Sequence, residues 1–283
     1  MRIVLIGAGN LMTSLSHALQ GAGHDILQVF SRTSPSADSL AQVLQCEAVT
    51  DIHRLNRDAD VYILAVKDSV LPTLAATIGA SVADKVLLHT AGSVPMDVFA
   101  GHARHYGVLY PMQTFSKRKL VDFSEVPCFV EGNDEVAAAV CNQLANDISN
   151  KVYALDSASR KYLHLSAVFA CNFANHCYAV AASLLQRHGI PFEVMLPLID
   201  ETTRKVHQLL PAEAQTGPAV RYDENVLRAQ EALLDDMPLY QQIYRLMSKS
   251  IHHAALGMNP NDRTLLEMDP PPMKTINNTR TKQ

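Results

Sequence analysis

A short apolar run that leads directly into a glycine-containing turn limits the fold of this chain more than any other feature. The residues RIVLI precede Gly7 and Gly9 in GAGNLM, and a helical pattern with Leu11, Leu15 and Leu19 follows. Intervals of four place these leucines on one side of a helix. A buried strand, a tight turn and an amphipathic helix are therefore expected at the start of the chain.

The same alternation of strand-like and helix-like segments continues over the first half of the chain. Further strands are expected at 26–30, 61–66, 86–90, 107–111, 127–132 and 151–155, and further helices from Ser36, over 70–78 and over 135–148. Strands that alternate with helices are typical of a parallel sheet covered on both faces. The pattern predicts an α/β fold, a doubly wound and mostly parallel Rossmann sheet, over residues 1–155.

Beyond residue 155 the strand-like pattern stops and helical patterns follow. We expect helices over 157–188, 192–210, 225–234 and 239–256, which would form an all-α domain at 156–258. The polar, proline-containing segment 259–283 is predicted to be a flexible tail. One apolar stretch, 163–185, is long enough to suggest a membrane span, but its internal His and Asn residues favour a buried helix of a soluble protein.

Size and charge narrow the class of partner. The chain has 283 residues and a net charge of −4, so it offers no basic excess for a nucleic acid, and a small molecule is the expected partner. Its five cysteines include no CxxC pair, which indicates reduced, buried thiols. The first residues do not form a signal peptide, and a cytoplasmic location is expected.

The glycine turn predicts a nucleotide-binding site. Gly7 would permit the tight turn, and Gly9, Asn10 and Leu11 would bring the backbone close to a pyrophosphate at the helix N-terminus. A turn without a ligand is the alternative. Met12 departs from the Gly or Ala usual at its position, and we expect it to loosen the packing of the helix against the strand.

The end of the second strand indicates which dinucleotide would bind. NAD sites place a carboxylate there, whereas this chain has Ser31, Arg32 and Thr33. A guanidinium and two hydroxyls suit a 2′-phosphate, which favours NADP(H) over NAD(H). A solvated loop arginine is the other interpretation of Arg32.

Two later loops follow strands that end at the same edge of the sheet. Residues of both loops are expected beside the nicotinamide half of the cofactor: Val66, Lys67, His89, Thr90 and Ala91.

The segments GAGNLM, SRT, LAVKDS and HTAGS make the first domain resemble the pyrroline-5-carboxylate reductase and hydroxyacid dehydrogenase superfamily. Together with YPMQTFS, DSASRKYLHLSAVFACNFANH and TGPAVRYD, they resemble a bacterial group of NADP oxidoreductase-like proteins with a helical C-terminal domain of unknown function. This resemblance implies a homodimer built through the C-terminal helices and an active site between the domains. It implies no substrate, and the chain lacks the GSGPA-type stretch of a true pyrroline-5-carboxylate reductase.

Catalytic candidates lie on the helix that begins at Ser157. At 100° per residue, Lys161, His164, Asn172 and Asn175 would share one face of it. Hydride transfer to a carbonyl or imine needs a proton donor, for which His164 is the first choice and Lys161 the second, with Asn172 orienting the substrate. Hydrogen bonding within a helical dimer core is the alternative role. Arg221, Tyr110 and Gln113 are weaker candidates.

No sequence signature supports a metal site or a covalent nucleophile. The sequence therefore predicts an NADP(H)-dependent oxidoreductase that acts on a small carbonyl or imine compound. A non-catalytic NADP(H) sensor is the alternative, because fold alone does not separate the two.

Overall fold

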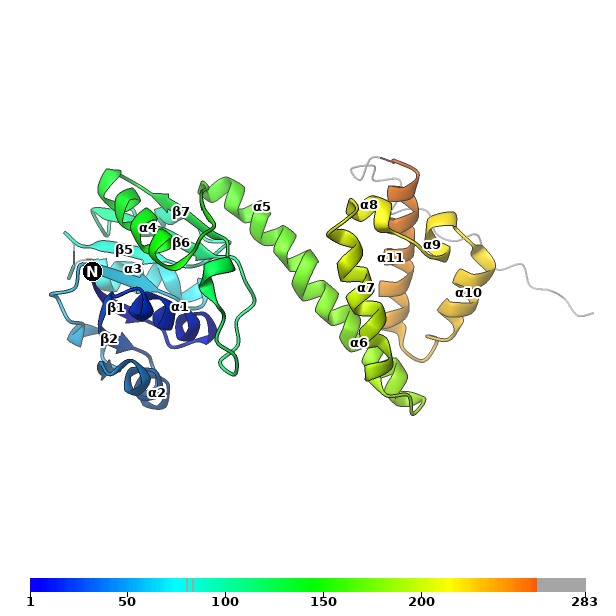
Figure 1. The fold of residues 1–283 in the computed structure, drawn as a ribbon, viewed down its shortest axis with the longest axis horizontal. Coiled ribbons are helices and arrows are strands. Elements are labelled where there is room, and N and C mark those ends of the chain that lie inside the picture. Colours follow the sequence, from blue (N-terminus) through cyan, green and yellow to red (C-terminus); the bar gives the residue numbers. More distant parts are fainter. Residues whose placement is uncertain (80, 83, 259–283) are drawn as a thin grey trace, which may run out of the picture. The chain divides into compact units, whose positions relative to one another are not determined.

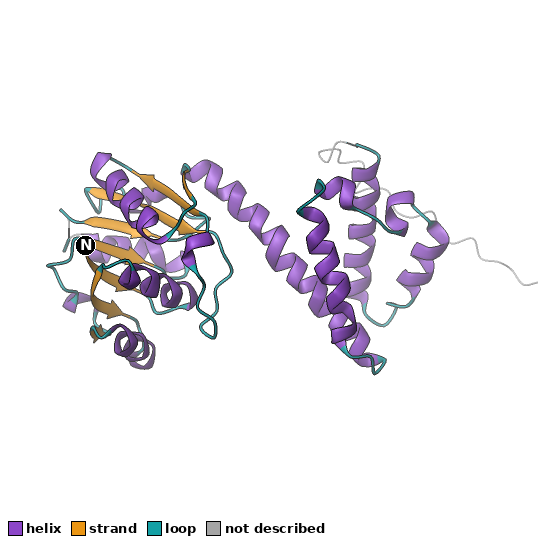
Figure 2. Cartoon of the chain, in the orientation of Figure 1, coloured by secondary structure: helices purple, strands orange, loops and turns teal. Residues whose placement is uncertain are grey.

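The computed structural model describes residues 1–79, 81–82 and 84–258 (Figures 1 and 2). The chain divides into two compact units, residues 1–176 and residues from 177 onward. The first unit thus extends past residue 155, where the sequence pattern changes from strand-like to helical, because the start of the helix that begins at Ser157 packs on the sheet. The predicted tail, 259–283, lies outside the described residues.

An eight-stranded sheet forms the centre of the first unit, in the order β3-β2-β1-β4-β5-β6-β7-β8. Neighbouring strands are parallel except for the antiparallel pair β6 and β7, which confirms the predicted doubly wound fold. The strands are β1 Arg2–Ile6, β2 Asp25–Phe30, β3 Glu47–Val49, β4 Val61–Leu64, β5 Val86–His89, β6 His105–Pro111, β7 Cys128–Gly132 and β8 Val152–Ala154. Strand β3 was not predicted, because its three residues are too few for a periodic pattern.

Helices cover both faces of this sheet. Ile3 and Leu5 of β1 pack on one side with α1 (Asn10–Gly21), α2 (Ser34–Leu44) and α4 (Glu135–Ile148). Their neighbours Val4 and Ile6 pack on the other side with α3 (Leu71–Gly79). Alternate residues of a strand point to opposite faces, so β1 is apolar throughout because both of its faces are buried.

A buried ion pair fastens α5 (Ser157–Ala167) to the sheet. Nη1 of Arg160, a residue that is 1% exposed, lies 2.5 Å from Oε2 of Glu131 on β7. Nη2 of Arg160 donates to the carbonyl oxygen of Val94, in the loop after β5, at 2.7 Å. Ser157 donates its hydroxyl to Glu131 and accepts the backbone N–H of Met96. The network joins α5, β7 and the loop after β5.

A π-helical segment, Val168–Phe173, separates α5 from α6 (Ala174–Arg187). An i→i+5 turn inserts one extra residue, which rotates everything after it by about 100° relative to a regular α-helix. A regular spacing of 100° per residue therefore does not hold from His164 to Asn172, and the face shared by Lys161, His164, Asn172 and Asn175 stays a prediction.

The helix that was expected to be buried is not buried within the chain. Between Ser157 and Arg187 an 18-residue window has mean hydropathy 1.3, and none of it is buried, so by length and composition alone this helix could cross a bilayer. Cys171 and Cys177 are exposed, contrary to the expectation of buried thiols, whereas Cys128 and Cys141 are buried and Cys46 is partly so.

The second unit contains only helices among its described residues. After α6 come α7 Leu196–Val206, α8 Pro211–Ala214, α9 Pro218–Arg221, α10 Glu224–Ala232 and α11 Pro238–Ala255. Side-chain contacts between α10 and α11 include Arg245 Nε donating to Glu231 at 3.0 Å and Tyr244 Oη donating to Gln230 at 2.7 Å.

We predict that Arg160→Met lowers the free energy of unfolding by about 3 kcal/mol, because removing one partner leaves a buried carboxylate uncompensated. Arg204→Met breaks an exposed ion pair with Glu201 and should cost less than about 1 kcal/mol. Denaturant unfolding of both variants measures the difference. Equal effects would show that the buried network does not stabilise the unit.

Candidate functional site

A cavity of about 780 Å³ lies within the first unit, at the carboxyl ends of β1, β2, β4 and β5. The strand order reverses between β1 and β4, and open α/β sheets bind ligands at such a switch point. Its volume is in the range of cofactor pockets. The cavity is lined by Gly7, Ala8, Gly9, Asn10, Leu11, Met12, Phe30, Ser31, Arg32, Thr33, Ser36, Ala65, Val66, Lys67, Asp68, Val70, Leu74, Thr90, Ala91, Gly92, Tyr110 and His164.

The glycine turn forms the middle of this cavity. Gly7 has φ +110°, and a Cβ there would collide with the carbonyl oxygen of Ala65, so the turn requires glycine. Gly9 is the N-cap of α1, and no atom lies within 4 Å of where its Cβ would be. The first turn of α1 contains no acidic side chain. The unpaired N–H groups there can bind an anion such as a pyrophosphate.

Met12 does not loosen the contact between α1 and the sheet. It is fully buried in the same apolar cluster as Ile3 and Leu5 of β1. The thioether side chain is flexible and fills the space between helix and strand. The expected remodelling at this position is therefore not seen.

One end of the cavity is lined by hydroxyls and a cation. Ser31, Arg32 and Thr33 follow β2 and line the cavity as predicted, and Ser36 in the first turn of α2 joins them. The described residues at this end include no carboxylate, since Asp68, in the loop after β4, is the one acidic residue among those that line the cavity. This end can accept a phosphate.

The other end is formed by the loops after β4 and β5. Val66, Lys67, Thr90 and Ala91 line it, as predicted. Ser93 donates its hydroxyl to Asp68, which ties the two loops together.

His89 does not line the cavity, although it was predicted to contact the cofactor. The residue is fully buried at the end of β5, where Nδ1 accepts the backbone N–H of Ala91 at 3.1 Å. Burial lowers the pKa of His89 to about 4, so the ring is neutral at pH 7. Strand alternation turns this side chain into the core, and its role is to hold the loop that carries Thr90 and Ala91.

His164 reaches the cavity from α5. Its Nδ1 lies 3.0 Å from the hydroxyl of Tyr110, which stands near the end of β6. A Cβ at Gly92 would lie 2.5 Å from the same Nδ1, so the loop after β5 needs glycine to let the ring approach. His164, Tyr110 and Gly92 thus come together from three elements.

The remaining catalytic candidates are not among the residues that line the cavity. Lys161 and Asn172 are exposed on the helix, away from that set. Gln113 is exposed and accepts the N–H of Thr114, while Arg221 belongs to the second unit. Tyr110, a weaker candidate from the sequence, does line the cavity, and its place near the carboxyl end of a strand was the signal for it.

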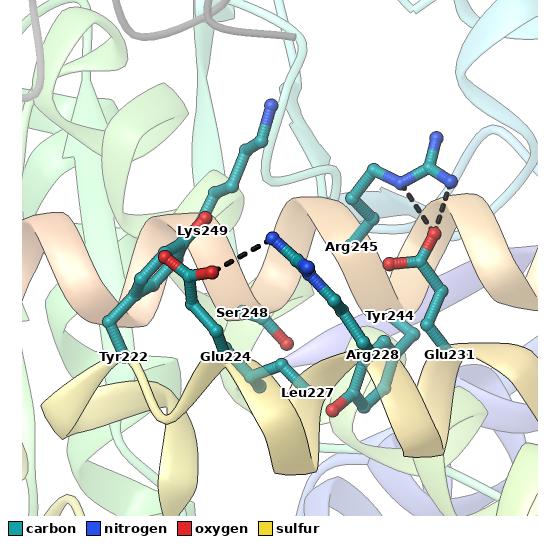
Figure 3. Close-up of a pocket in the computed structure, with 9 residues that line it drawn as sticks. All are labelled: Tyr222, Glu224, Leu227, Arg228, Glu231, Tyr244, Arg245, Ser248 and Lys249. Carbon is teal, nitrogen blue, oxygen red and sulfur yellow. Dashed lines mark hydrogen bonds and ion pairs between the residues drawn. The ribbon is translucent and has the colours of Figure 1, made fainter. Parts of the chain in front are cut away.

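A second hollow, in the second unit, is a poorer candidate (Figure 3). Its volume is about 70 Å³, too small for a dinucleotide. Two of its cations are paired with carboxylates, Arg228 with Glu224 of the same helix at 2.8 Å and Arg245 of α11 with Glu231 of α10. It is lined by Tyr222, Glu224, Leu227, Arg228, Glu231, Tyr244, Arg245, Ser248 and Lys249.

Two family models match the chain. Residues 2–92 match the family described as NADP oxidoreductase, coenzyme F420-dependent, and residues 126–251 match a domain of unknown function, DUF2520. No curated protein matches the chain.

Solved structures resemble the chain over most of its length. A Bacteroides fragilis protein described as a proposed NADP oxidoreductase is 52% identical, with a TM-score of 0.85 over 89% of this chain and 98% of the other. A Streptomyces aurantiacus imine reductase is 15% identical, with a TM-score of 0.62 over 91% and 95% of the two chains. A Coxiella burnetii pyrroline-5-carboxylate reductase is 15% identical, with a TM-score of 0.55 over 90% and 97%.

The last two resemblances, at low identity, concern the fold alone. The identity and coverage of the first are high enough to define a family. In this chain a domain of the NADP oxidoreductase type precedes a DUF2520 domain, and the chain belongs to the oxidoreductase family of the Bacteroides fragilis protein.

Proposed function

We propose that this protein transfers a hydride between NADP(H) and a small carbonyl or imine compound. The observation that carries the proposal is a single cavity with an anion-binding helix N-terminus in its middle, a hydroxyl-rich end with Arg32, and His164 among its lining residues. The related Bacteroides fragilis protein, described as a proposed NADP oxidoreductase, supports the same cofactor.

NADP(H) is favoured over NAD(H) by the chemistry of the end of the cavity that follows β2. Arg32 supplies a guanidinium and Ser31, Thr33 and Ser36 supply hydroxyls, all of which can hydrogen-bond to a 2′-phosphate. An NAD site would need a carboxylate here for the ribose hydroxyls.

We predict that Arg32→Ala weakens NADPH binding by about 10- to 100-fold and leaves NADH binding unchanged, because a hydrogen bond to a charged group contributes about 1.5–3 kcal/mol. Thermal shift with NADPH, NADP⁺, NADH and NAD⁺ measures this, since a ligand at 100 times its Kd adds about 2.7 kcal/mol to stability. Arg57→Ala, at an exposed arginine outside the cavity, is the matched control.

Equal losses for NADPH and NADH would mean that Arg32 does not contact a 2′-phosphate. If none of the four nucleotides stabilised the protein, the proposed cofactor would be wrong.

His164 is proposed as the proton donor of the reaction. The bound cofactor would supply the hydride, and the nitrogen or oxygen of the reduced substrate then needs a proton. His164 is the histidine that lines the cavity, since His89 is buried behind it. Among the residues first considered, Lys161 and Asn172 lack this placement.

We predict that His164→Ala lowers the kcat of NADPH-dependent reduction by about 10²- to 10⁴-fold, the usual contribution of a general acid. NADPH oxidation with 1-pyrroline and with a set of small aldehydes is the assay. The affinity for NADPH should not change. His53→Ala, at an exposed histidine of the same unit, is the control. Full activity of the His164 variant on an accepted substrate would exclude the histidine as the donor.

We also propose that the chain forms a homodimer through its C-terminal helices. Large apolar side chains are exposed on them, and such surfaces on one chain indicate an interface. They include Leu165, Phe169, Phe173, Leu196, Leu198, Leu239, Leu246 and Met247.

Light scattering on the full chain should give the mass of a dimer, and the double variant Phe169→Asp, Phe173→Asp should give that of a monomer. A charge in an apolar interface carries a large desolvation cost. Leu120→Asp, at an exposed leucine of the first unit, should leave the mass unchanged. A wild-type monomer, or a chain recovered with membranes, would contradict the dimer.

A further inference from the structure

Tyr110 and His164 form a hydrogen-bonded pair within the cavity. The Tyr110 hydroxyl lies 3.0 Å from Nδ1 of His164, and the two rings meet nearly edge to face, at 71° with centroids 6.0 Å apart. Both residues line the cavity. One ring nitrogen of His164 is thus occupied by a protein partner, and among the described residues no hydrogen-bond partner is found for Nε2.

The histidine ring is held in place from several sides. Gly92 lets the loop after β5 lie against Nδ1 and Cγ of the ring and against Cβ of His164. One helical turn before His164, Arg160 fixes α5 to Glu131 and to the Val94 carbonyl oxygen. A histidine held this firmly is suited to present one defined nitrogen to a ligand.

Burial decides which group of the pair donates. It raises the pKa of the Tyr110 hydroxyl above its usual value, an effect that the charge of Arg160 partly opposes and that Cys171 adds to. The phenol therefore keeps its proton at neutral pH and donates it to the hydrogen bond. Nδ1 of His164 is then the acceptor, which leaves the ring proton on Nε2.

We propose that Tyr110 is a positioning residue that fixes the tautomer of His164 with its proton on Nε2 and replaces that proton during the reaction. This inference rests on the proposed function. As the hydride reaches the substrate, the Nε2–H bond breaks and a new N–H or O–H bond forms on the substrate. Nδ1 takes the Tyr110 proton in the same step. Afterwards Nδ1 returns this proton to the phenolate and Nε2 takes a proton from water, which restores the starting tautomer.

The charged and titratable groups around Tyr110 and His164 are compatible with these proton transfers. Arg160 lies on α5 one turn before His164 and has Glu131 of β7 as its counter-ion. The positive charge of Arg160 favours a transient phenolate at Tyr110. His89, on β5, is neutral because burial lowers its pKa to about 4, so it adds no charge. Cys171, on the π-helical segment, acts in the opposite direction to Arg160, since it raises the pKa of Tyr110.

The test is the protonation of His164 in the full chain, measured by NMR after ¹⁵N labelling of the histidines. His164→Gln identifies the signals. In the wild type we expect Nε2 to carry the proton and Nδ1 to behave as an unprotonated acceptor. Tyr110→Phe removes the donor and should abolish this selectivity, so that both tautomers are seen. Tyr106→Phe, on the same strand but outside the cavity, should leave the His164 signals unchanged.

A proton on Nδ1 in the wild type would overturn the proposal, and so would unchanged His164 signals in Tyr110→Phe. If Tyr110→Phe failed to fold, the wild-type tautomer and the variant Gly92→Ala, which pushes the ring away from its place, would decide the question. The NMR experiment needs neither NADPH nor a substrate. Its failure is therefore distinguishable from failure of the proposed cofactor, which the thermal shift measures.

Discussion

The buried ion pair between Arg160 and Glu131 is the constraint on which the candidate site depends. It joins the start of α5 to β7, and through the Val94 carbonyl oxygen to the loop after β5. A buried cation and anion tolerate little displacement, because separating them leaves each without compensation in a medium of low dielectric constant. His164 lies one turn further along α5, so the position of its ring beside Tyr110 follows from this attachment.

The cavity combines groups that attract a phosphate with a pair of side chains that can deliver a proton. The N-terminus of α1 and the Arg32 end offer positive potential to a phosphate-bearing molecule, whereas the Tyr110 and His164 pair offers one directed proton. Backbone geometry at Gly7 and Gly92 brings the parts together, since a Cβ at either position would collide with a neighbouring element. These features are all contained in the first unit, which makes its cofactor chemistry testable separately from the assembly of the second.

How much of the site could be predicted depended on whether a residue follows a strand or lies on a helix. Residues in the turns after β1, β2 and β4 line the cavity as predicted, because the carboxyl ends of parallel strands meet at one edge. His89 does not line the cavity, since it is the last residue of β5 and its side chain still points into the core. Asn172 does not line the cavity, and it lies in a π-helical segment that a regular period of 100° does not reveal.

The sequence by itself determined the α/β fold, the glycine turn and the cofactor end with Ser31, Arg32 and Thr33, because each depends on neighbouring residues and on the periodicity of apolar side chains. Only the tertiary structure decided the partner of His164, the burial of His89 and the attachment made by Arg160. These depend on contacts between segments far apart in the chain, such as Tyr110 with His164 and Glu131 with Arg160. Local pattern carries no information about such contacts, since packing of the whole unit sets them.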